Sequence, residues 1–461
     1  DFTRNYIQLL ETVTTDDLQR VAKLYLRDES LTITSLDPKD QEAPSIKTSK
    51  SSAPGEITAH TLSNGLQLIH RHDPRVPTVY MQSAFRCGLP AESPATSGIN
   101  RLHSTLLTMG TTSRSSAEIA EEIESLGASL RAGSGNNTSI VSAFSLTPDL
   151  AQVLEVAADI LINPTFPQAA LERERETQLA DLEEAMEDPV KTAFRTMRKQ
   201  LFGNQHYGLH SLGSEESLNA LTPELLRNHH DQYITGSNGA LSLFGDISLE
   251  DAIALCEEKF AALPTGTAIS GDDHQADGTG ELITHLDKQQ AVLAIGYPGA
   301  AADSADAPAL ELIHDYCSNM AGPLFTRIRE ELGLAYYVSA TQFHGLGTGL
   351  FAFYLGTSPD QIELARVKLI EEITRLATEG VPDEAIEHSK TSLLASDALE
   401  NQSNRAMAQG CAINTLLGLG PLHHLETAKR IRSLTPEDIR EVTARYLGSA
   451  EPVIATVLPQ A

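Results

Sequence analysis

A helix followed by a β-rich segment occurs three times in the sequence, and this repeat constrains the fold more than any other feature. The helical copies are Val13–Leu26, Leu221–Tyr233 and Leu434–Leu447. In each copy a threonine occupies the N-cap and acidic residues follow in the first turn, and two copies have proline at the first helical position. The β-rich runs that follow are Leu31–Ser35, Gly239–Phe244 and Pro452–Val457. Each copy therefore predicts a helix and a closing strand at the end of a domain.

The repeat also predicts where domains end. Two copies are expected at the ends of domains inside the chain, whereas no domain stands before the copy in residues 1–36 in this sequence. We therefore expect residues 1–36 to be the tail of an upstream domain, in a longer precursor or as an arm of a separate subunit. A simple N-terminal helix and strand is the alternative. Residues 37–55 are rich in Pro, Ser and Lys, and residues 264–280 are rich in Gly, Thr and Asp. Both segments are predicted linkers, which leaves domains at 56–263 and 281–461.

The two predicted domains have similar orders of strands and helices. In the first we expect strands at Ile57–Thr61, Leu66–Arg71, Thr78–Phe85 and Ser139–Ser145, and helices at Ser116–Leu126, Pro148–Leu161 with Thr147 as cap, and Gln168–Glu187. In the second we expect strands at Ala291–Tyr297, Tyr337–Phe343 and Gly349–Thr357, and helices at Ala307–Asn319, Leu324–Glu331, Asp360–Thr378 and over 383–447. This pattern predicts a duplicated α+β unit, each copy a mainly antiparallel sheet with helices packed on one face.

The charge and cysteine content exclude several classes of function. Lys and Arg number 34 against 62 Asp and Glu, which gives a net charge of −28. This balance argues against nucleic acids and anionic membranes as partners, and it fits either a cationic partner or a solvated acidic surface. No apolar run approaches the ~18–20 residues of a membrane span. Cys87, Cys256, Cys317 and Cys411 fit no CxxC spacing and are expected to be buried thiols, so a structural zinc site is not expected.

Several segments resemble motifs of the M16 metallopeptidases, the family of insulinase, pitrilysin and the mitochondrial processing peptidase. They are the hairpin Asn64-Gly65-Leu66, the stretch Gly98–Thr111, the helix exit Ala157–Phe166, the helix start Leu171–Glu176 and the second-domain segment Gly322–Tyr336. The resemblance covers nearly all of 56–461, and residues 1–36 resemble the end of another such subunit. It implies the metallohydrolase fold of LuxS and the mitochondrial processing peptidase.

The zinc-binding motif of the family is degenerate in this chain. In the family the stretch reads Gly-x-x-His-x-x-Glu-His, which places two imidazoles and a general base on one helical face for Zn²⁺. Here Arg101, Ser104 and Thr105 stand at those three positions. The third ligand position of the family corresponds to Asp181. Because a guanidinium does not bind Zn²⁺ and a serine is not a carboxylate base, we expect no metal at this site.

The second-domain motif is intact. Arg329 and Tyr336 are seven residues apart, and Gly333 is expected to end the helix between them. In the family an Arg/Tyr pair of this spacing faces the zinc of the other half, which implies stabilisation of the oxyanion. The alternative is that Arg329 compensates the helix dipole and pairs with Glu330 or Glu331 while Tyr336 packs.

Two further features bear on the site. The strand that follows the helix Ser116–Leu126 presents a peptide-binding edge in the family, and Arg131 stands there where catalytic halves usually carry Asn, so a partner-facing edge is the alternative. His103 lies two residues after Arg101, about 200° round the helix, and is expected to be buried or capping. The adjacent pairs His229–His230 and His423–His424 are expected to be structural or exposed.

The resemblance implies a zinc-less subunit of a heterodimeric M16 endopeptidase. The partner, an M16 subunit with an intact HxxEH motif, would supply Zn²⁺, and this chain would supply Arg329, Tyr336 and half of a chamber that degrades peptides. No activity is expected of the chain alone. The alternative is a purely structural M16 homologue. Bacterial relatives of the two-subunit kind are often periplasmic, which makes the periplasm the expected compartment.

Overall fold

The computed structural model describes residues 12–26, 54–269 and 274–460, and the chain divides into two compact units, Asp1–Ser51 and Ser52–Ala461. In the first unit the predicted helix is present as α2 (Thr15–Tyr25). Thr14 caps it, and Thr14 and Asp17 form a reciprocal capping box. No residue of α2 is buried. The strand predicted at Leu31–Ser35 lies outside the described residues.

The first sheet of the second unit has six strands in the order β1-β2-β6-β3-β5-β4. They are β1 (Thr58–Thr61), β2 (Gln67–His72), β6 (Gly239–Gly245), β3 (Thr78–Arg86), β5 (Thr138–Leu146) and β4 (Ser129–Ser134). The pairing is antiparallel except between β2 and β6. Gly65 has φ of +90° in the turn between β1 and β2, which confirms the predicted Asn-Gly hairpin.

Helices pack on one face of this sheet. They are α3 (Ile99–Leu106), α4 (Ser116–Ser125), α5 (Leu150–Ile162), α9 (Pro223–Tyr233) and α10 (Leu249–Lys259). Alternate strand residues such as Leu68, Met81 and Val141 enter one core with Leu102 and Leu154 of the helices. The acidic helix α6 (Gln168–Glu187) has the predicted bounds and packs against α3, and α8 (Glu215–Ala220) lies beside it.

The second sheet has five strands in the order β7-β11-β8-β10-β9. They are β7 (Gly280–Leu286), β11 (Val453–Pro459), β8 (Ala291–Gly299), β10 (Gly349–Thr357) and β9 (Tyr337–His344), and only β7 and β11 are parallel. One face packs on α11 (Ala307–Ser318), α12 (Ile362–Glu379), α13 (Asp383–Glu400) and α16 (Pro436–Thr443), and α15 (His423–Ser433) lies against α13. The predicted α+β class, with two similar mainly antiparallel sheets, is therefore confirmed.

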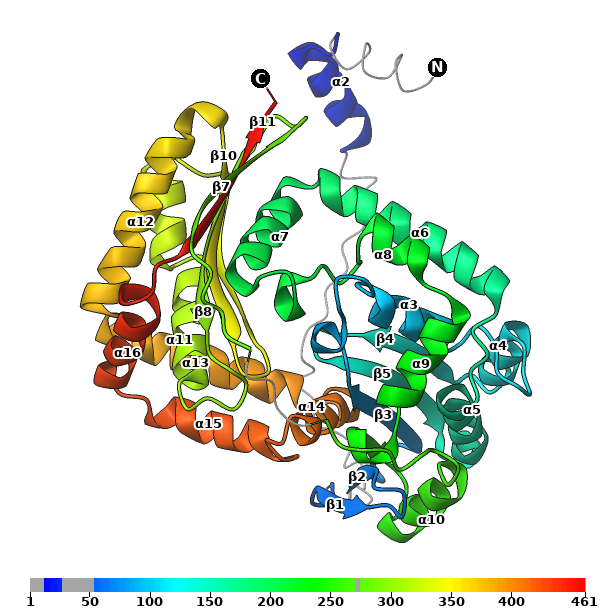
Figure 1. The fold of residues 1–461 in the computed structure, drawn as a ribbon. Helices are drawn as coiled ribbons and strands as arrows, with labels where there is room; N and C mark the ends of the chain where they lie inside the picture. The colour runs from blue at the N-terminus through cyan, green and yellow to red at the C-terminus, as the bar shows by residue number, and fades with distance from the viewer. Residues whose placement is uncertain (1–11, 27–53, 270–273, 461) are drawn as a thin grey trace. The chain divides into compact units, whose positions relative to one another are not determined.

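Each sheet is also covered on its second face, by a helix from the other half of the unit. Helix α14 (Asn404–Leu416) sets Met407 and Cys411 against Tyr80 and Phe244 of the first sheet. Helix α7 (Pro189–Phe202) sets Ala193, Met197 and Leu201 against Val292 and Val453 of the second. Figure 1 shows α7 on the side of the second sheet opposite α12 and α16. The sequence analysis predicted helices on only one face of each sheet, so the exchange of α7 and α14 was not predicted.

The start of α5 differs from the prediction. Thr147 is not its cap, because Thr147–Asp149 form a 3₁₀ turn with Pro148 and the α-helix begins only at Leu150. Helices α7 and α10 and strand β7 were not predicted. No helix among the described residues is long and apolar enough to cross a membrane.

Candidate functional site

A buried carboxylate fixes the N-terminus of α3, the helix that carries the degenerate motif. Gly98 has φ of +87°, and the Glu92 side chain accepts hydrogen bonds from the backbone N–H groups of Gly98 (2.8 Å) and Asn100 (3.0 Å). Burial raises the pKa of Glu92 to about 8, although both backbone donors oppose the shift. A Cβ at Gly98 would lie 2.9 Å from the backbone oxygen of Leu212, so glycine is required at this position.

An ion pair joins two of the positions at which the sequence resemblance expects zinc ligands. The Nη2 atom of Arg101 lies 2.9 Å from Oδ2 of Asp181, so the predicted third-ligand position does face the first. Thr105 Oγ1 donates to the carbonyl oxygen of Arg101, and buried Ser104 contacts the hydroxyl of Ser139 at 3.1 Å. These donors do not fit Zn²⁺, and no group of three or more His, Cys, Asp or Glu in the described part of the chain could hold a metal. Both charged side chains are nearly half exposed, so the pair adds only ~0–1 kcal/mol to stability.

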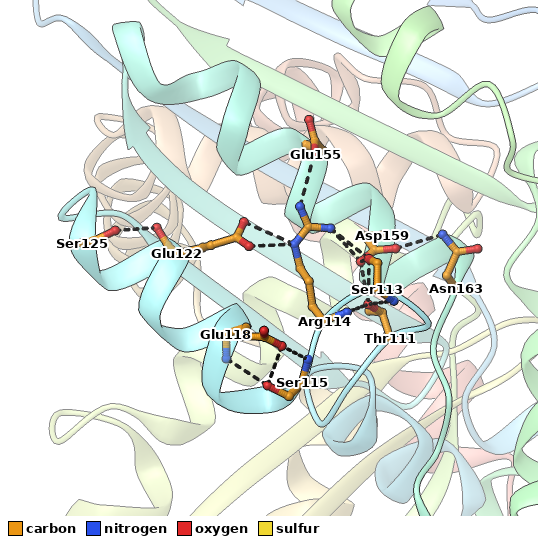
Figure 2. A network of polar contacts seen from close by, with 10 residues as sticks. All are labelled: Thr111, Ser113, Arg114, Ser115, Glu118, Glu122, Ser125, Glu155, Asp159 and Asn163. Carbon is orange, nitrogen blue, oxygen red and sulfur yellow. Dashed lines mark hydrogen bonds and ion pairs between the residues drawn. The ribbon is translucent and has the colours of Figure 1, made fainter.

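The threonine that ends the Gly98–Thr111 stretch belongs to a polar network around the buried carboxylate of Asp159 (Figure 2). Asp159 Oδ2 accepts hydrogen bonds from Thr111 (2.6 Å), Ser113 (2.8 Å) and Arg114 (2.9 Å), and its Oδ1 accepts one from Asn163 (2.9 Å). Burial opposes ionisation of Asp159, yet these donors outweigh it and lower its pKa. The motif residues Thr111, Asp159 and Asn163 therefore have a structural role, joining the segment after α3 to the end of α5.

Arg114 extends the network to the surface. Its guanidinium also pairs with Glu122 at 3.1 Å and Glu155 at 3.2 Å, and these carboxylates raise its pKa against the opposing effect of burial. Figure 2 shows the neighbouring capping box, in which Ser115 and Glu118 begin α4. Arg114 therefore links α4 and α5, because Glu122 lies on α4 whereas Glu155 and Asp159 lie on α5.

We predict that Thr111→Val lowers the free energy of unfolding by roughly 1.5–3 kcal/mol, because the isosteric change removes a hydrogen bond to a buried charge. Urea unfolding followed by circular dichroism measures it. The control Ser125→Ala removes an exposed hydroxyl that donates only to the backbone oxygen of Glu122, and it should change stability by less than about 0.5 kcal/mol. Equal stabilities of the two variants would contradict the structural role.

Three histidines that the sequence analysis considered separately form one buried cluster. His103 Nε2 lies 3.0 Å from His230 Nδ1, and the ring of His229 is 5.3 Å from that of His103. His229 Nε2 also contacts the Cys87 thiol at 3.2 Å. The prediction that His103 is buried is confirmed, and His229 and His230 are buried rather than exposed. Helix periodicity gave no sign of this cluster, because α3 and α9 are distant in sequence.

The second-domain motif forms a π-helical segment, η6 (Leu324–Glu331). Gly333 has φ of +63°, and Leu334 N–H donates to Ile328 O, so Gly333 ends the helix as predicted. Arg329 is exposed. Its guanidinium lies 4.8 Å over the ring of Phe325 and 4.0 Å from the Glu330 carboxylate. The cation–π contact with Phe325 was not predicted.

Tyr336 leads into β9. Its backbone N–H donates to Gly356 O on β10, whereas its side chain is 57% exposed. The alternative expected Tyr336 to pack, but the residue is exposed; the pairing of Arg329 with Glu330 that it also expected is present at 4.0 Å. Arg329 and Tyr336 are therefore both exposed residues of the second unit.

Two family models match most of the chain. The family model described as "Insulinase (Peptidase family M16)" matches residues 67–215, and the model described as "Peptidase M16 inactive domain" matches 220–393. The chain belongs to the M16 peptidase family. An uncharacterized zinc protease of Rickettsia bellii is 26% identical over 76% of this chain and 82% of its own length. The uncharacterized zinc protease YmxG of Bacillus subtilis is 24% identical over 87% and 98%.

Solved structures share the fold. The crystal structure of a peptidase M16 inactive domain from Pseudomonas fluorescens superposes with a TM-score of 0.82 at 22% identity, covering 88% of this chain and 98% of that one. A protease from Helicobacter pylori gives a TM-score of 0.81 at 15% identity. In this chain Arg101 pairs with Asp181, Thr105 donates to the backbone oxygen of Arg101, and Ser104 contacts Ser139.

Proposed function

We propose that this chain is the zinc-less subunit of a two-subunit M16 metalloendopeptidase, and that it forms half of a chamber in which peptides are cleaved. The Arg101–Asp181 ion pair is the observation that carries the proposal. A chain with Arg101 and Thr105 in place of the two imidazoles, and Ser104 in place of the general base, has no means of its own to activate water at that site. Peptide hydrolysis then depends on an M16 partner with an intact HxxEH motif, and the periplasm is the proposed compartment on family resemblance alone.

Arg329 and Tyr336 are the proposed contribution of this chain to the chemistry. A guanidinium and a phenolic O–H both donate hydrogen bonds, and both can stabilise the negative oxygen of a tetrahedral intermediate. Their exposure supports a role toward another molecule. Among the described residues, the ion pair recorded for these two side chains is the 4.0 Å contact of Arg329 with Glu330. Stacking on Phe325 restricts the Arg329 side chain and reduces the entropy lost when it binds an oxyanion.

Metal analysis tests the proposal directly. The purified chain, dialysed against Zn²⁺ and then against buffer, is expected to retain less than about 0.1 zinc per chain and to cleave no peptide. Adding an HxxEH-bearing M16 subunit is expected to give a stable complex with one zinc and peptidase activity. One tightly bound zinc in the isolated chain that disappears in Asp181→Ala would overturn the proposal. A stable complex without activity would favour the structural homologue instead.

A further inference from the structure

A pocket of about 210 Å³ lies where four elements from the second half of the unit meet. Helix α15 packs against both α11 and α14 (Figure 1), and the end of strand β9 lines the pocket as well. Neither the Arg101–Asp181 pair nor Arg329 and Tyr336 contribute to its walls. At ~30 Å³ for each water molecule, the pocket has room for roughly seven waters, which is the size of a small organic molecule.

Glu311 of α11 brings to this pocket a carboxylate that has no partner among the described residues. None of them donates a hydrogen bond to it or forms an ion pair with it, and burial together with the nearby charge of Asp397 raises the pKa of Glu311 to about 7. The hydration that the carboxylate loses on burial is therefore not replaced by protein groups. An ammonium group beside Glu311 would replace it and favour the ionised carboxylate.

His344, at the end of β9, adds a second acceptor to the pocket. Its Nδ1 atom lies 3.1 Å from the carbonyl oxygen of Ala300, which assigns the proton of the neutral ring to Nδ1 and leaves Nε2 as an acceptor. Nε2 is buried, and no donor among the described residues reaches it. Burial lowers the pKa of His344, which keeps the ring neutral near pH 7. The two acceptors therefore require a donor from an occupant of the pocket.

Helix α15 brings a positive charge to the same pocket. Arg430 is exposed and pairs with no carboxylate among the described residues, whereas Glu426, one turn before it, is bonded to Lys429 at 2.6 Å. Burial and the charge of Arg430 lower the pKa of His423, which also lines the pocket, so this imidazole is neutral near pH 7. The guanidinium of Arg430 is thus available to a carboxylate.

These groups fit neither a metal ion nor a simple cation. Glu311, His344 and His423 line one pocket, yet no group of three or more His, Cys, Asp or Glu within the described ranges could hold a metal. A simple cation would be attracted by Glu311 and repelled by Arg430. A ligand that has an ammonium at one end and a carboxylate at the other satisfies both charged side chains.

We propose that this pocket binds a free α-amino acid with an apolar side chain. The ammonium donates hydrogen bonds to Glu311 and His344, the carboxylate is received by Arg430, and the apolar side chain contacts Leu417 and Leu419 of the same wall. The binding requires neither zinc nor a partner subunit, and it does not depend on the proposed peptidase role.

Isothermal titration calorimetry on the full chain tests the proposal, with L-alanine, L-valine and L-leucine as probes. At least one of them is expected to bind with a dissociation constant below about 1 mM. The amide of that amino acid keeps the ammonium and its N-acetyl derivative keeps the carboxylate, and each is expected to bind about tenfold more weakly or worse. Absence of binding by all three probes, or equal affinity for the amino acid and its amide, would overturn the proposal.

Variants assign the binding to this pocket. Glu311→Gln keeps the shape of the side chain and removes its charge, and Arg430→Gln changes an exposed residue, so that it leaves the fold intact. Each is expected to weaken the binding of the amino acid about tenfold or more. Arg432→Gln, on the same helix but outside the pocket walls, is the control and should have no effect.

Undiminished affinity in Arg430→Gln, or in a folded Glu311→Gln, would contradict the proposal, as would an equal loss in Arg432→Gln. Circular dichroism of each variant shows whether it is folded. Because no zinc and no partner subunit is present in these titrations, their failure would leave the two-subunit proposal standing.

Discussion

Arg329→Ala is expected to lower the turnover number of the reconstituted two-subunit peptidase about 10²–10³-fold, the usual effect of losing one oxyanion donor. The side chain stacks on Phe325 and is exposed, so its removal leaves no buried cavity and the fold should persist. Tyr336→Phe removes only a phenolic O–H from a side chain that is 57% exposed, and a similar loss of turnover is expected. Steady-state kinetics on the purified complex measures both.

The matched control for this prediction lies two residues away in the same π-helical segment. Arg327 pairs with Glu372 at 3.2 Å, and Arg327→Ala should leave the turnover number unchanged. A donor that acts in the transition state lowers kcat and leaves KM nearly constant, whereas a general disturbance of the chamber changes KM as well. Equal turnover in Arg329→Ala and Arg327→Ala would remove the catalytic role and leave the structural homologue.

Acid is expected to destabilise the chain through the buried histidine cluster of α3 and α9. Burial lowers the pKa of His229 and of His230 to about 4, and burial together with both neighbouring imidazoles lowers that of His103 well below its usual 6.5. In the unfolded chain each imidazole takes up a proton near pH 6.5. The contribution to stability is therefore complete above about pH 6.5 and is lost as the pH falls toward 4.

Three protons taken up only on unfolding correspond to a slope of up to roughly 4 kcal/mol per pH unit. The side chains in contact with the three rings include the Cys87 thiol, the Tyr233 phenol and the Phe166 ring, and none of these supplies a negative charge near pH 5 to stabilise an imidazolium. Burial raises the pKa of the Cys87 thiol, so it stays protonated. The backbone of Leu161 forms a hydrogen bond with His230 that favours its protonated form, but burial outweighs this effect on the pKa of His230.

Urea unfolding at a series of pH values measures the slope. His103→Leu removes one of the three titrating groups and should reduce the slope between pH 6 and 4.5 by about 1.4 kcal/mol per pH unit. Loss of the hydrogen bond to His230 lowers stability at pH 8 as well, so the slope and not the absolute stability is the readout. His60 on β1 is exposed, and His60→Gln serves as the control. An unchanged slope in His103→Leu would contradict the prediction.

Local signals in the sequence predicted most elements of the fold. The Asn-Gly turn, the capping threonines at Thr222 and Thr435, and the uninterrupted helical composition of Gln168–Glu187 each specify structure over a few residues. The duplicated architecture followed from the repeat. What local patterns could not predict is the packing of α7 and α14, because Met197 meets Val292 and Met407 meets Tyr80 across long sequence separations.

The candidate site, like the fold, was predicted only in part from the sequence. The resemblance to the family motif predicted that Arg101 and Asp181 face each other, and in the structure Nη2 of Arg101 lies 2.9 Å from Oδ2 of Asp181. The contact of Arg329 with Phe325 and the meeting of His103 with His229 depend on side-chain directions that periodicity alone does not give. A hollow of about 580 Å³ beside the first sheet is a further example, because Arg131 of β4 and Arg405 of α14 line it from different halves of the unit.

Because α7 and α14 each cover the sheet of the other half, the two sheets depend on each other for stability. Cutting the chain in the segment 264–280 would strip α14 from Phe244 and α7 from Val453, so each fragment would expose an apolar sheet face to water. The arrangement is that of a domain-swapped dimer whose two protomers have been fused into a single polypeptide. Each half of the unit therefore needs the other to cover the second face of its sheet, and neither half is expected to fold alone.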